Sequence, residues 1–372
     1  MDVLERLRRT PATKNLKVDV VCILLIATGL TLLREITMRL LLRPIGAKYV
    51  VSVSPDEPTT SSSKTQNGAN GNGASSTDAV AKGSRTLSKR ERRRLQHLQR
   101  HNESRFAEQG WSVLYYTCAS LVGLYISVHQ PWWPMNMKEF WTDYPELTID
   151  ALIKYYYLVQ TGFYVHQMIV LHLEAPRKDH WQMFSHHVIT IGLQTASYAV
   201  CYHRVGVAVM MLLDPCDVLL SAAKMLRYVG FQTLCDIFFG LFLLSWLVLR
   251  HVLYNCVLYS VMFDNDLYSD VGTRKSGLSK ATITHILIAM LAVLQCILLM
   301  WFVMIVKVAY RVVTGSGAAD TRSDDEDEDE FDSASTEDEV VSNGAKKNGR
   351  AIASSALEGT TKEARQRTTI KS

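Results

Sequence analysis

Features that would mark several other protein classes are missing from this 372-residue sequence. Its seven cysteines all fall inside apolar stretches, and none has the paired loop spacing of a disulfide framework or a zinc site. The sequence has no visible internal repeat, which argues against a transporter built from inverted repeats. The first apolar run is followed by Arg34, Glu35, Arg39 and Arg43 rather than by small residues, so we expect no cleavable signal peptide.

What the sequence does contain is a series of long apolar stretches. They lie at about residues 18–42, 111–129, 150–173, 182–203, 205–227, 231–262 and 281–310. Each is close to 20 residues or longer, enough to cross a ~30 Å hydrocarbon core as a helix. We therefore expect an all-α, polytopic membrane protein with about seven transmembrane helices.

Composition divides the chain into five parts. We expect a basic N-terminal segment at 1–17, a first transmembrane helix at 18–42, a flexible basic loop at 43–105, a domain of six transmembrane helices at 106–311 and a disordered acidic tail at 312–372. The loop includes a Ser-, Thr-, Asn- and Gly-rich linker at 51–84 that is too poor in apolar side chains to order itself. In the tail, Ser323 and Ser335 are followed by acidic residues, as acidophilic kinases prefer, and are candidate phosphorylation sites.

Positive charge predicts the orientation in the membrane. Lysines and arginines are concentrated in the 43–110 loop, and further basic residues occur at Arg177, Lys178 and Arg311. Seven crossings place all of these on one side, which should be the cytosol. The basic N-terminal segment would then be luminal, against the usual charge rule. The run at 88–101 is interpreted as a cytosolic juxtamembrane anchor, and a nucleic-acid partner is not expected.

Four titratable side chains lie inside two adjacent apolar stretches. His186 and His187 are in the fourth stretch, and Asp214 and Asp217 are in the fifth. Ionisable groups at membrane depth are expensive and usually face a bundle interior or a cavity. On a helix, Gln182, His186, Thr190 and Ser197 lie close to one stripe with His187 on its flank, while Asp214, Asp217, Ser221 and Lys224 form a second stripe.

This set of side chains permits proton transfer or nucleophilic attack near neutral pH. A neutral imidazole can accept a proton or attack a carbonyl, and a carboxylate on its other nitrogen would fix the tautomer. The alternative for a lone histidine is helix packing, but a histidine pair beside a D-x-x-D stripe favours a site. A di-iron centre is disfavoured because the H-x3-H and H-x2-H-H clusters of membrane desaturases are missing, with Met183 where the tight cluster would need histidine. We expect no metal and no cofactor.

The run from Glu174 to Val229 resembles the signature region of ceramide synthases of the TLC-domain family, fungal branch. That signature has R-K-D, an aromatic residue, H-H, D-x-x-D, a lysine and a tyrosine. The matching residues are Arg177, Lys178, Asp179, Trp181, His186, His187, Asp214, Asp217, Lys224 and Tyr228. The resemblance extends through LLREITMRLLLRP at 32–44, EQGW at 108–111, WTDYP at 141–145 and LVLRHV at 247–252. It departs in having few residues before LLREITM and in Pro215 between the aspartates.

The resemblance implies transfer of a fatty acyl group from acyl-CoA, a co-substrate, to the amine of a sphingoid base such as dihydrosphingosine or phytosphingosine. It implies that six of the helices form a TLC-type barrel in the endoplasmic reticulum membrane, with a cytosolic tail. His186, His187, Asp214 and Asp217 would be catalytic, and Arg177, Lys178, Lys224, Arg250 and His251 would bind substrate. A small accessory membrane subunit and a homo- or heterodimer are further expectations. A TLC protein that binds or transports lipid without chemistry is the alternative.

Overall fold

The structure, a computed structural model, describes residues 3–52, 88–142, 144, 148–174, 179–264 and 280–314. All of them lie in the first of two units, residues 1–318. Several predicted features fall outside the described residues, namely residues 53–84 of the flexible linker expected at 51–84, Arg177, Lys178, and residues 315–372 of the acidic tail, with Ser323 and Ser335.

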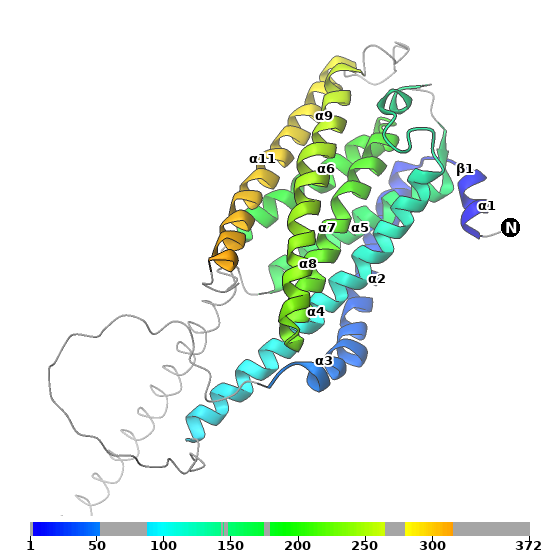
Figure 1. The fold of residues 1–372 in the computed structure, drawn as a ribbon. Helices are drawn as coiled ribbons and strands as arrows, with labels where there is room; N and C mark the ends of the chain where they lie inside the picture. The colour runs from blue at the N-terminus through cyan, green and yellow to red at the C-terminus, as the bar shows by residue number, and fades with distance from the viewer. Residues whose placement is uncertain are drawn as a thin grey trace, which may run out of the picture. The chain divides into compact units, whose positions relative to one another are not determined.

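The described chain is almost entirely helical (Figure 1). Its helices are α1 (Val3–Arg9), α2 (Leu16–Thr37), η1 (Met38–Leu42), α3 (Arg43–Tyr49), α4 (Lys89–Val128), η2 (Met137–Phe140), α5 (Ala151–Leu173), α6 (His180–Ala199), α7 (His203–Val229), α8 (Gln232–Ser245), η3 (Trp246–Leu253), α9 (Tyr254–Phe263) and α11 (Lys280–Val313). Two short strands, β1 (Pro11–Ala12) and β2 (Ile149–Asp150), pair antiparallel.

Within the part of the chain that the structure describes, five continuous helical runs are long and apolar enough to cross a membrane, which confirms an all-α polytopic membrane protein. They are Leu16–Tyr49, Lys89–Val128, His203–Val229, Gln232–Phe263 and Thr282–Arg311. The other two predicted spans correspond to α5 and α6, which are 23 and 20 residues long but interrupted by polar side chains. The count of seven crossings and the barrel arrangement of six of them stay predictions.

Part of the expected flexible loop is helical. Residues 43–49 form α3, and α4 begins at Lys89, well before the predicted apolar stretch at 111. Ser88 and Glu91 form a capping box that satisfies the first backbone donors of α4. The 40 residues of α4 span ~60 Å at 1.5 Å per residue, so its exposed basic start extends beyond a single hydrocarbon core.

Helix α7 is the central element of the bundle. It packs against α4 and α8 and also contacts α5, α6, η3 and α9. Half of its most apolar window is buried, against 11% for the α2–α3 run, which packs mainly on α5 and lies at the periphery. The helix ends at Gly230, whose φ of 85° is a conformation that glycine adopts readily.

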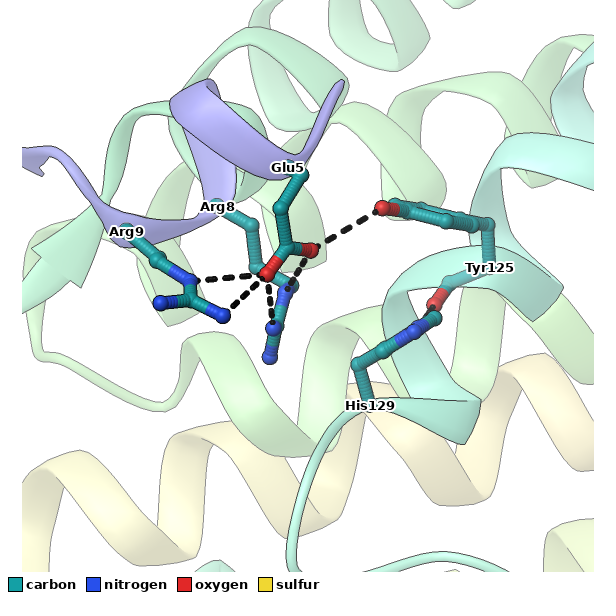
Figure 2. Close-up of polar contacts among 5 residues, drawn as sticks. All are labelled: Glu5, Arg8, Arg9, Tyr125 and His129. Carbon is teal, nitrogen blue, oxygen red and sulfur yellow. Dashed lines mark hydrogen bonds and ion pairs between the residues drawn. The ribbon is translucent and has the colours of Figure 1, made fainter. Parts of the chain in front are cut away.

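The N-terminal segment is fastened to one end of the bundle. The carboxylate of Glu5 accepts hydrogen bonds from Arg8 at 2.7 and 3.0 Å and from Arg9 at 2.7 Å, and the Tyr125 hydroxyl of α4 donates to it at 3.4 Å (Figure 2). Farther along, Lys154 of α5 pairs with buried Asp19 at 2.7 Å. The segment therefore has both polar and strand contacts with the bundle.

Candidate active site

The histidine pair lies in the second turn of α6 and faces the interior. His187 is only 4% exposed, and the centres of the two imidazole rings are 5.6 Å apart. The Tyr164 ring of α5 lies 6.3 Å from His186 and 5.9 Å from His187, and Trp301 of α11 lies 5.2 Å from His186. The buried Nδ1 atoms of both histidines have no hydrogen-bond partner among the described residues. The His186 ring therefore keeps a free nitrogen for a ligand, whereas the His187 ring also interacts with the Met183 carbonyl of its own helix.

Asp214 is the most deeply buried carboxylate of the site. It is 1% exposed, and Oδ2 accepts a hydrogen bond from Gln160 Nε2 of α5 at 2.5 Å. The side-chain oxygen of Gln160 in turn accepts from the Tyr115 hydroxyl of α4 at 2.7 Å, and its Nε2 also donates to Tyr156 at 3.2 Å. A chain of hydrogen bonds across α4, α5 and α7 thus fixes this carboxylate.

Asp217 is held by a buried arginine. Arg250 Nη2 donates to Asp217 Oδ2 at 2.7 Å and to the Leu213 carbonyl at 2.8 Å, and its guanidinium lies 4.0 Å from the Trp246 ring centre. Arg250 is 5% exposed and belongs to η3, a π-helical stretch. Such stretches are rare and frequently occur at functional sites. Pairing with a carboxylate is what makes a guanidinium at this depth tolerable.

Tyr164 connects the histidines with the aspartates. Its ring touches both imidazoles, and its hydroxyl interacts electrostatically with Asp214 and Asp217. The charge of Arg250 also acts on His186. The structure thus brings all four predicted catalytic residues into one region together with Arg250.

The geometry corrects two expectations. The buried polar stripe of α6 runs through His187, Thr190, Gln194 and Ser197, not through Gln182 and His186. The spacing of 3, 7 and 10 residues keeps this set on one face. The expected carboxylate on an imidazole nitrogen is not seen either, since the aspartates are bound by Gln160 and Arg250.

Two other predicted substrate-binding residues lie apart from this cluster. The ring of His251 faces α11, with Nδ1 2.9 Å from Gln295 Nε2 and the ring centre 4.8 Å from that of Phe302. Lys224 is half-buried, about two turns beyond Asp217 on α7. Among the described residues, no group of three or more His, Cys, Asp or Glu side chains is arranged to hold a metal ion.

Several residues of the site were missed from the sequence. The residues that contact it without having been predicted are Gln160, Tyr115, Tyr164, Trp246 and Trp301. A signal was available for Gln160, because an amide inside an apolar span needs a hydrogen-bond partner. The aromatic residues carry no comparable signal, since tyrosine and tryptophan are common in spans.

An apolar cavity opens beside the site. Its wall is formed by α6, α7, α9 and α11. Tyr164 of α5 lines the end next to the histidines, and Tyr202 lines the opposite end. Most of the lining is aliphatic, including Leu193, Val205, Val209, Leu213, Val261, Leu287, Leu291 and Leu294. A polar cluster that adjoins such a cavity suits a reaction on a long hydrocarbon chain.

Comparison with known proteins identifies the family. The model of the TLC domain matches residues 105–307, more than half of the chain. The chain belongs to the TLC-domain family. The matched TLC segment contains the histidine pair, both aspartates, Gln160 and Arg250.

Curated relatives of this TLC segment include fungal and animal proteins. The chain is 43% identical over 239 residues to a protein of Schizosaccharomyces pombe named sphingosine N-acyltransferase lag1, covering 63% of this chain and 60% of that protein. It is 35% identical to Ceramide Synthase FUM18 of Gibberella moniliformis, over 65% of this chain and 61% of the relative. Mouse ceramide synthase 4 is 32% identical over 66% of this chain and 60% of its own length. The chain thus spans about 60% of the length of these relatives.

Proposed function

We propose that this chain is a ceramide synthase, which transfers a fatty acyl group from acyl-CoA to the amine of a sphingoid base. The observation that carries the proposal is the position of His187 and Asp214 beside an apolar cavity within a TLC segment. The names of the relatives, sphingosine N-acyltransferase and ceramide synthase, support the same reaction.

The reaction needs a base and a place for two hydrocarbon chains. The amine nitrogen forms a bond to the thioester carbonyl carbon, the carbon–sulfur bond breaks, and CoA leaves as the thiol after protonation. A neutral imidazole can take the proton that the amine must lose. The buried imidazoles of His186 and His187 suit this role. Alternatively, one imidazole attacks the thioester first and the amine resolves the acyl-imidazole.

The two carboxylates are suited to electrostatic roles. Asp217 is neutralised by Arg250, whereas among the described residues Asp214 accepts a hydrogen bond only from the neutral amide of Gln160. An anionic Asp214 would attract the cationic amine of the acceptor or an imidazolium that forms during the reaction. We assign Asp214 this electrostatic role and Asp217 the role of holding Arg250 in place.

CoA is expected at the end of the bundle that carries the basic residues. The exposed start of α4 contains Lys89, Arg90, Arg92, Arg93 and Arg94, which would attract the phosphates of CoA. We place this end in the cytosol and the protein in the endoplasmic reticulum membrane. Steering by Arg177 and Lys178, an accessory subunit and a dimer stay predictions.

An acyltransfer assay separates this proposal from a lipid-binding TLC protein without chemistry. The purified chain is given acyl-CoA and dihydrosphingosine, and the products are measured by mass spectrometry. Formation of dihydroceramide and free CoA is expected. A correctly inserted chain that binds the lipids but forms no amide would favour the non-catalytic alternative.

A further inference from the structure

Two polar groups inside the apolar cavity have no partner. Thr190 is 7% exposed and Gln194 is 5% exposed, and both line the cavity. The Thr190 hydroxyl and the side-chain oxygen of Gln194 make no hydrogen bond in the part of the chain that the structure describes. A buried polar atom without a partner costs roughly 1–3 kcal/mol in proteins. Such atoms facing a cavity point to a ligand that supplies the bond.

Two other polar residues of the same cavity, Ser197 and Tyr202, are satisfied. The Ser197 hydroxyl donates to the backbone carbonyl of Gln194 at 3.1 Å and lies 3.2 Å from the Tyr157 hydroxyl. The hydroxyl of Tyr202 lies 3.0 Å from Thr284 Oγ1. The contrast singles out Thr190 and Gln194 as the hydrogen-bonding groups that the cavity leaves for its occupant.

The conformation of Thr190 supports this reading. A threonine inside a helix can give its hydroxyl to the carbonyl four residues earlier. Thr195 does so on the same helix, donating to the Ile191 carbonyl, whereas Thr190 does not. Gln194 is one turn farther along, and helical side chains lean toward the N-terminus, so its amide covers the turn that holds Thr190. The Nε2 of Gln194 reaches only the weak acceptor Met210 Sδ, at 3.2 Å.

The position along α6 indicates which part of a substrate would meet these groups. Thr190 lies three residues from His187, about 4.5 Å along the helix axis. A group bound at Thr190 is therefore within a few bonds of the reacting atoms. A sphingoid base has hydroxyl groups on both carbons next to its amine carbon, whereas a plain fatty acyl chain has none.

We propose that Thr190 and Gln194 form a subsite that binds the hydroxyl groups of the sphingoid base and so selects this amine over one without hydroxyls. The proposal rests on the ceramide synthase function proposed above. A site built to hydrogen-bond a hydroxyl rejects an analogue that lacks it, because its own polar groups then stay buried and unpaired. An aliphatic cavity without this pair would accept any long-chain amine.

Two acceptors of equal chain length test the subsite, namely dihydrosphingosine and a primary alkylamine without hydroxyls. In the full-length protein we expect kcat/KM to favour dihydrosphingosine by at least about 100-fold. Thr190→Val and Gln194→Leu should each shrink this ratio about tenfold or more, mainly through loss of activity on dihydrosphingosine. Thr195→Val is the matched control, since its hydroxyl is bound to its own helix, and should leave the ratio unchanged.

Binding without acyl-CoA keeps this test separate from the proposed function. Dihydrosphingosine should raise the melting temperature of the wild-type protein more than the alkylamine does, and Thr190→Val should remove the difference. Equal binding of both amines by the wild type would overturn the subsite while leaving acyltransfer intact. Preferential binding without any amide formation would retain the subsite and overturn the function. The acyl donor is tested by comparing a 2-hydroxyacyl-CoA with a plain acyl-CoA. If Thr190→Val lowered activity only with the 2-hydroxyacyl-CoA, the two groups would bind the acyl donor, and the proposal would be overturned.

Discussion

At the scale of single residues, the two histidines occupy different surroundings. His187 belongs to the buried stripe of α6 that continues into the cavity, whereas His186 packs against Trp301 and is only partly buried. Both are near Tyr164, and the His186 Nδ1 has no partner among the described residues, whereas the His187 ring interacts with the Met183 carbonyl. Either ring could carry the proton or the acyl group. His187 is closer to the apolar cavity than His186 is, because it lies on the same face of α6 as Thr190 and Gln194.

Replacing either histidine should abolish most activity without preventing insertion. We expect His187→Ala and His186→Ala each to lower turnover about 100-fold or more, as for loss of an acid–base or nucleophilic group. Turnover is compared at equal abundance of inserted protein. His172→Ala is the control, because that side chain is exposed, hydrogen-bonds the Met168 carbonyl of its own helix and makes edge contacts with the His180 and Phe184 rings, so its loss should have little effect. Normal turnover in either test variant would remove that histidine from the mechanism.

Gln160 should prove important although it is neither acidic nor basic. Gln160→Leu removes the donor to Asp214 and the acceptor of Tyr115, so we expect at least tenfold lower turnover and a free energy of unfolding lower by about 1–3 kcal/mol. Gln167→Leu changes the same residue type on the same helix at a position without a hydrogen bond among the described residues, and should be nearly neutral. If Gln160→Leu lost stability but kept full turnover per folded molecule, Gln160 would be a packing residue only.

These residues also show what the sequence can predict of a site. Histidines and aspartates in apolar spans are recognised because their burial is expensive, and the stripes place them on helix faces. The partner of each carboxylate could not be predicted, since Gln160 and Arg250 come from helices whose packing on α7 no local pattern specifies. For the same reason, the sequence could not decide whether the aspartates orient an imidazole or attract the cationic amine, and the structure shows no hydrogen bond between these aspartates and the histidine pair among the described residues.

At the scale of elements, the contact between α5 and α7 depends on Gly206. A Cβ at this position would lie 1.7 Å from the Tyr157 hydroxyl oxygen and 3.1 Å from Ser197 Oγ. Tyr157 is 1% exposed and hydrogen-bonded to the His203 carbonyl at 3.2 Å, so it has little room to move. The absence of a side chain therefore allows the close approach of these helices.

Gly206→Ala should destabilise the bundle by about 1–3 kcal/mol, the range for overpacking. Thermal unfolding in detergent measures the change. Gly240 in α8 has no atom within 4 Å of its would-be Cβ, so Gly240→Ala should be neutral or stabilising by up to ~1 kcal/mol. Equal melting temperatures for the two variants would show that α5 and α7 are not packed as described.

The helices themselves were largely predictable, and their ends less so. Apolar length located all seven long helical segments, but it placed the break between α6 and α7 at residue 204, whereas the structure has it at residues 200–202. The extension of α4 back to Lys89 was missed because the roughly six turns before Trp111 are mostly basic and polar, although the capping residues Ser88 and Glu91 were visible. The π-helical turns and the β1–β2 pairing depend on tertiary contacts and have no local signal.

At the scale of the whole molecule, the positive charge of the N-terminal segment conflicts with the predicted orientation in the membrane. Its arginines lie on the side predicted to be luminal, against the usual preference for basic residues in the cytosol. In the structure, Arg8 and Arg9 are paired with Glu5. The pairing reduces the net positive charge that this end presents and removes part of the conflict.

The attachment of α1 through Glu5 should not respond to pH in the physiological range. Hydrogen bonds from Arg8 and Arg9 lower the pKa of the Glu5 carboxyl from 4.5 to about 2. A carboxyl with a depressed pKa contributes stability above its unfolded value, and this contribution is lost only as the pH falls through about 2. Hydrogen exchange of residues 3–9 should therefore show equal protection at pH 5 and pH 8 after correction for intrinsic rates.

Removing the charge of Glu5 provides the matching control. Glu5→Gln keeps the shape but weakens the ion pairs, so exchange at residues 3–9 should be faster at both pH values. A protection that changes between pH 5 and pH 8 in the wild type but not in Glu5→Gln would show that Glu5 titrates in this window. That outcome would contradict the arginine pairing.

The orientation of the whole chain can be tested with glycosylation. The sequence Asn102-Glu103-Ser104 is a formal acceptor site, but it lies in α4 on the side predicted to be cytosolic, so it should carry no glycan. Because it is also near the apolar part of α4, a clearer site is needed.

Asn72→Thr creates an acceptor at Asn70 within the long polar linker, far from both flanking apolar stretches. Cytosolic placement predicts no glycan there, whereas a flexible N-terminal extension carrying an acceptor sequence should be modified in the lumen. A mass shift of the Asn72→Thr protein that endoglycosidase reverses would place the linker in the lumen, and with it the basic start of α4. CoA, which is cytosolic, could then not reach the histidines from that end, and the direction of access proposed here would have to be reversed.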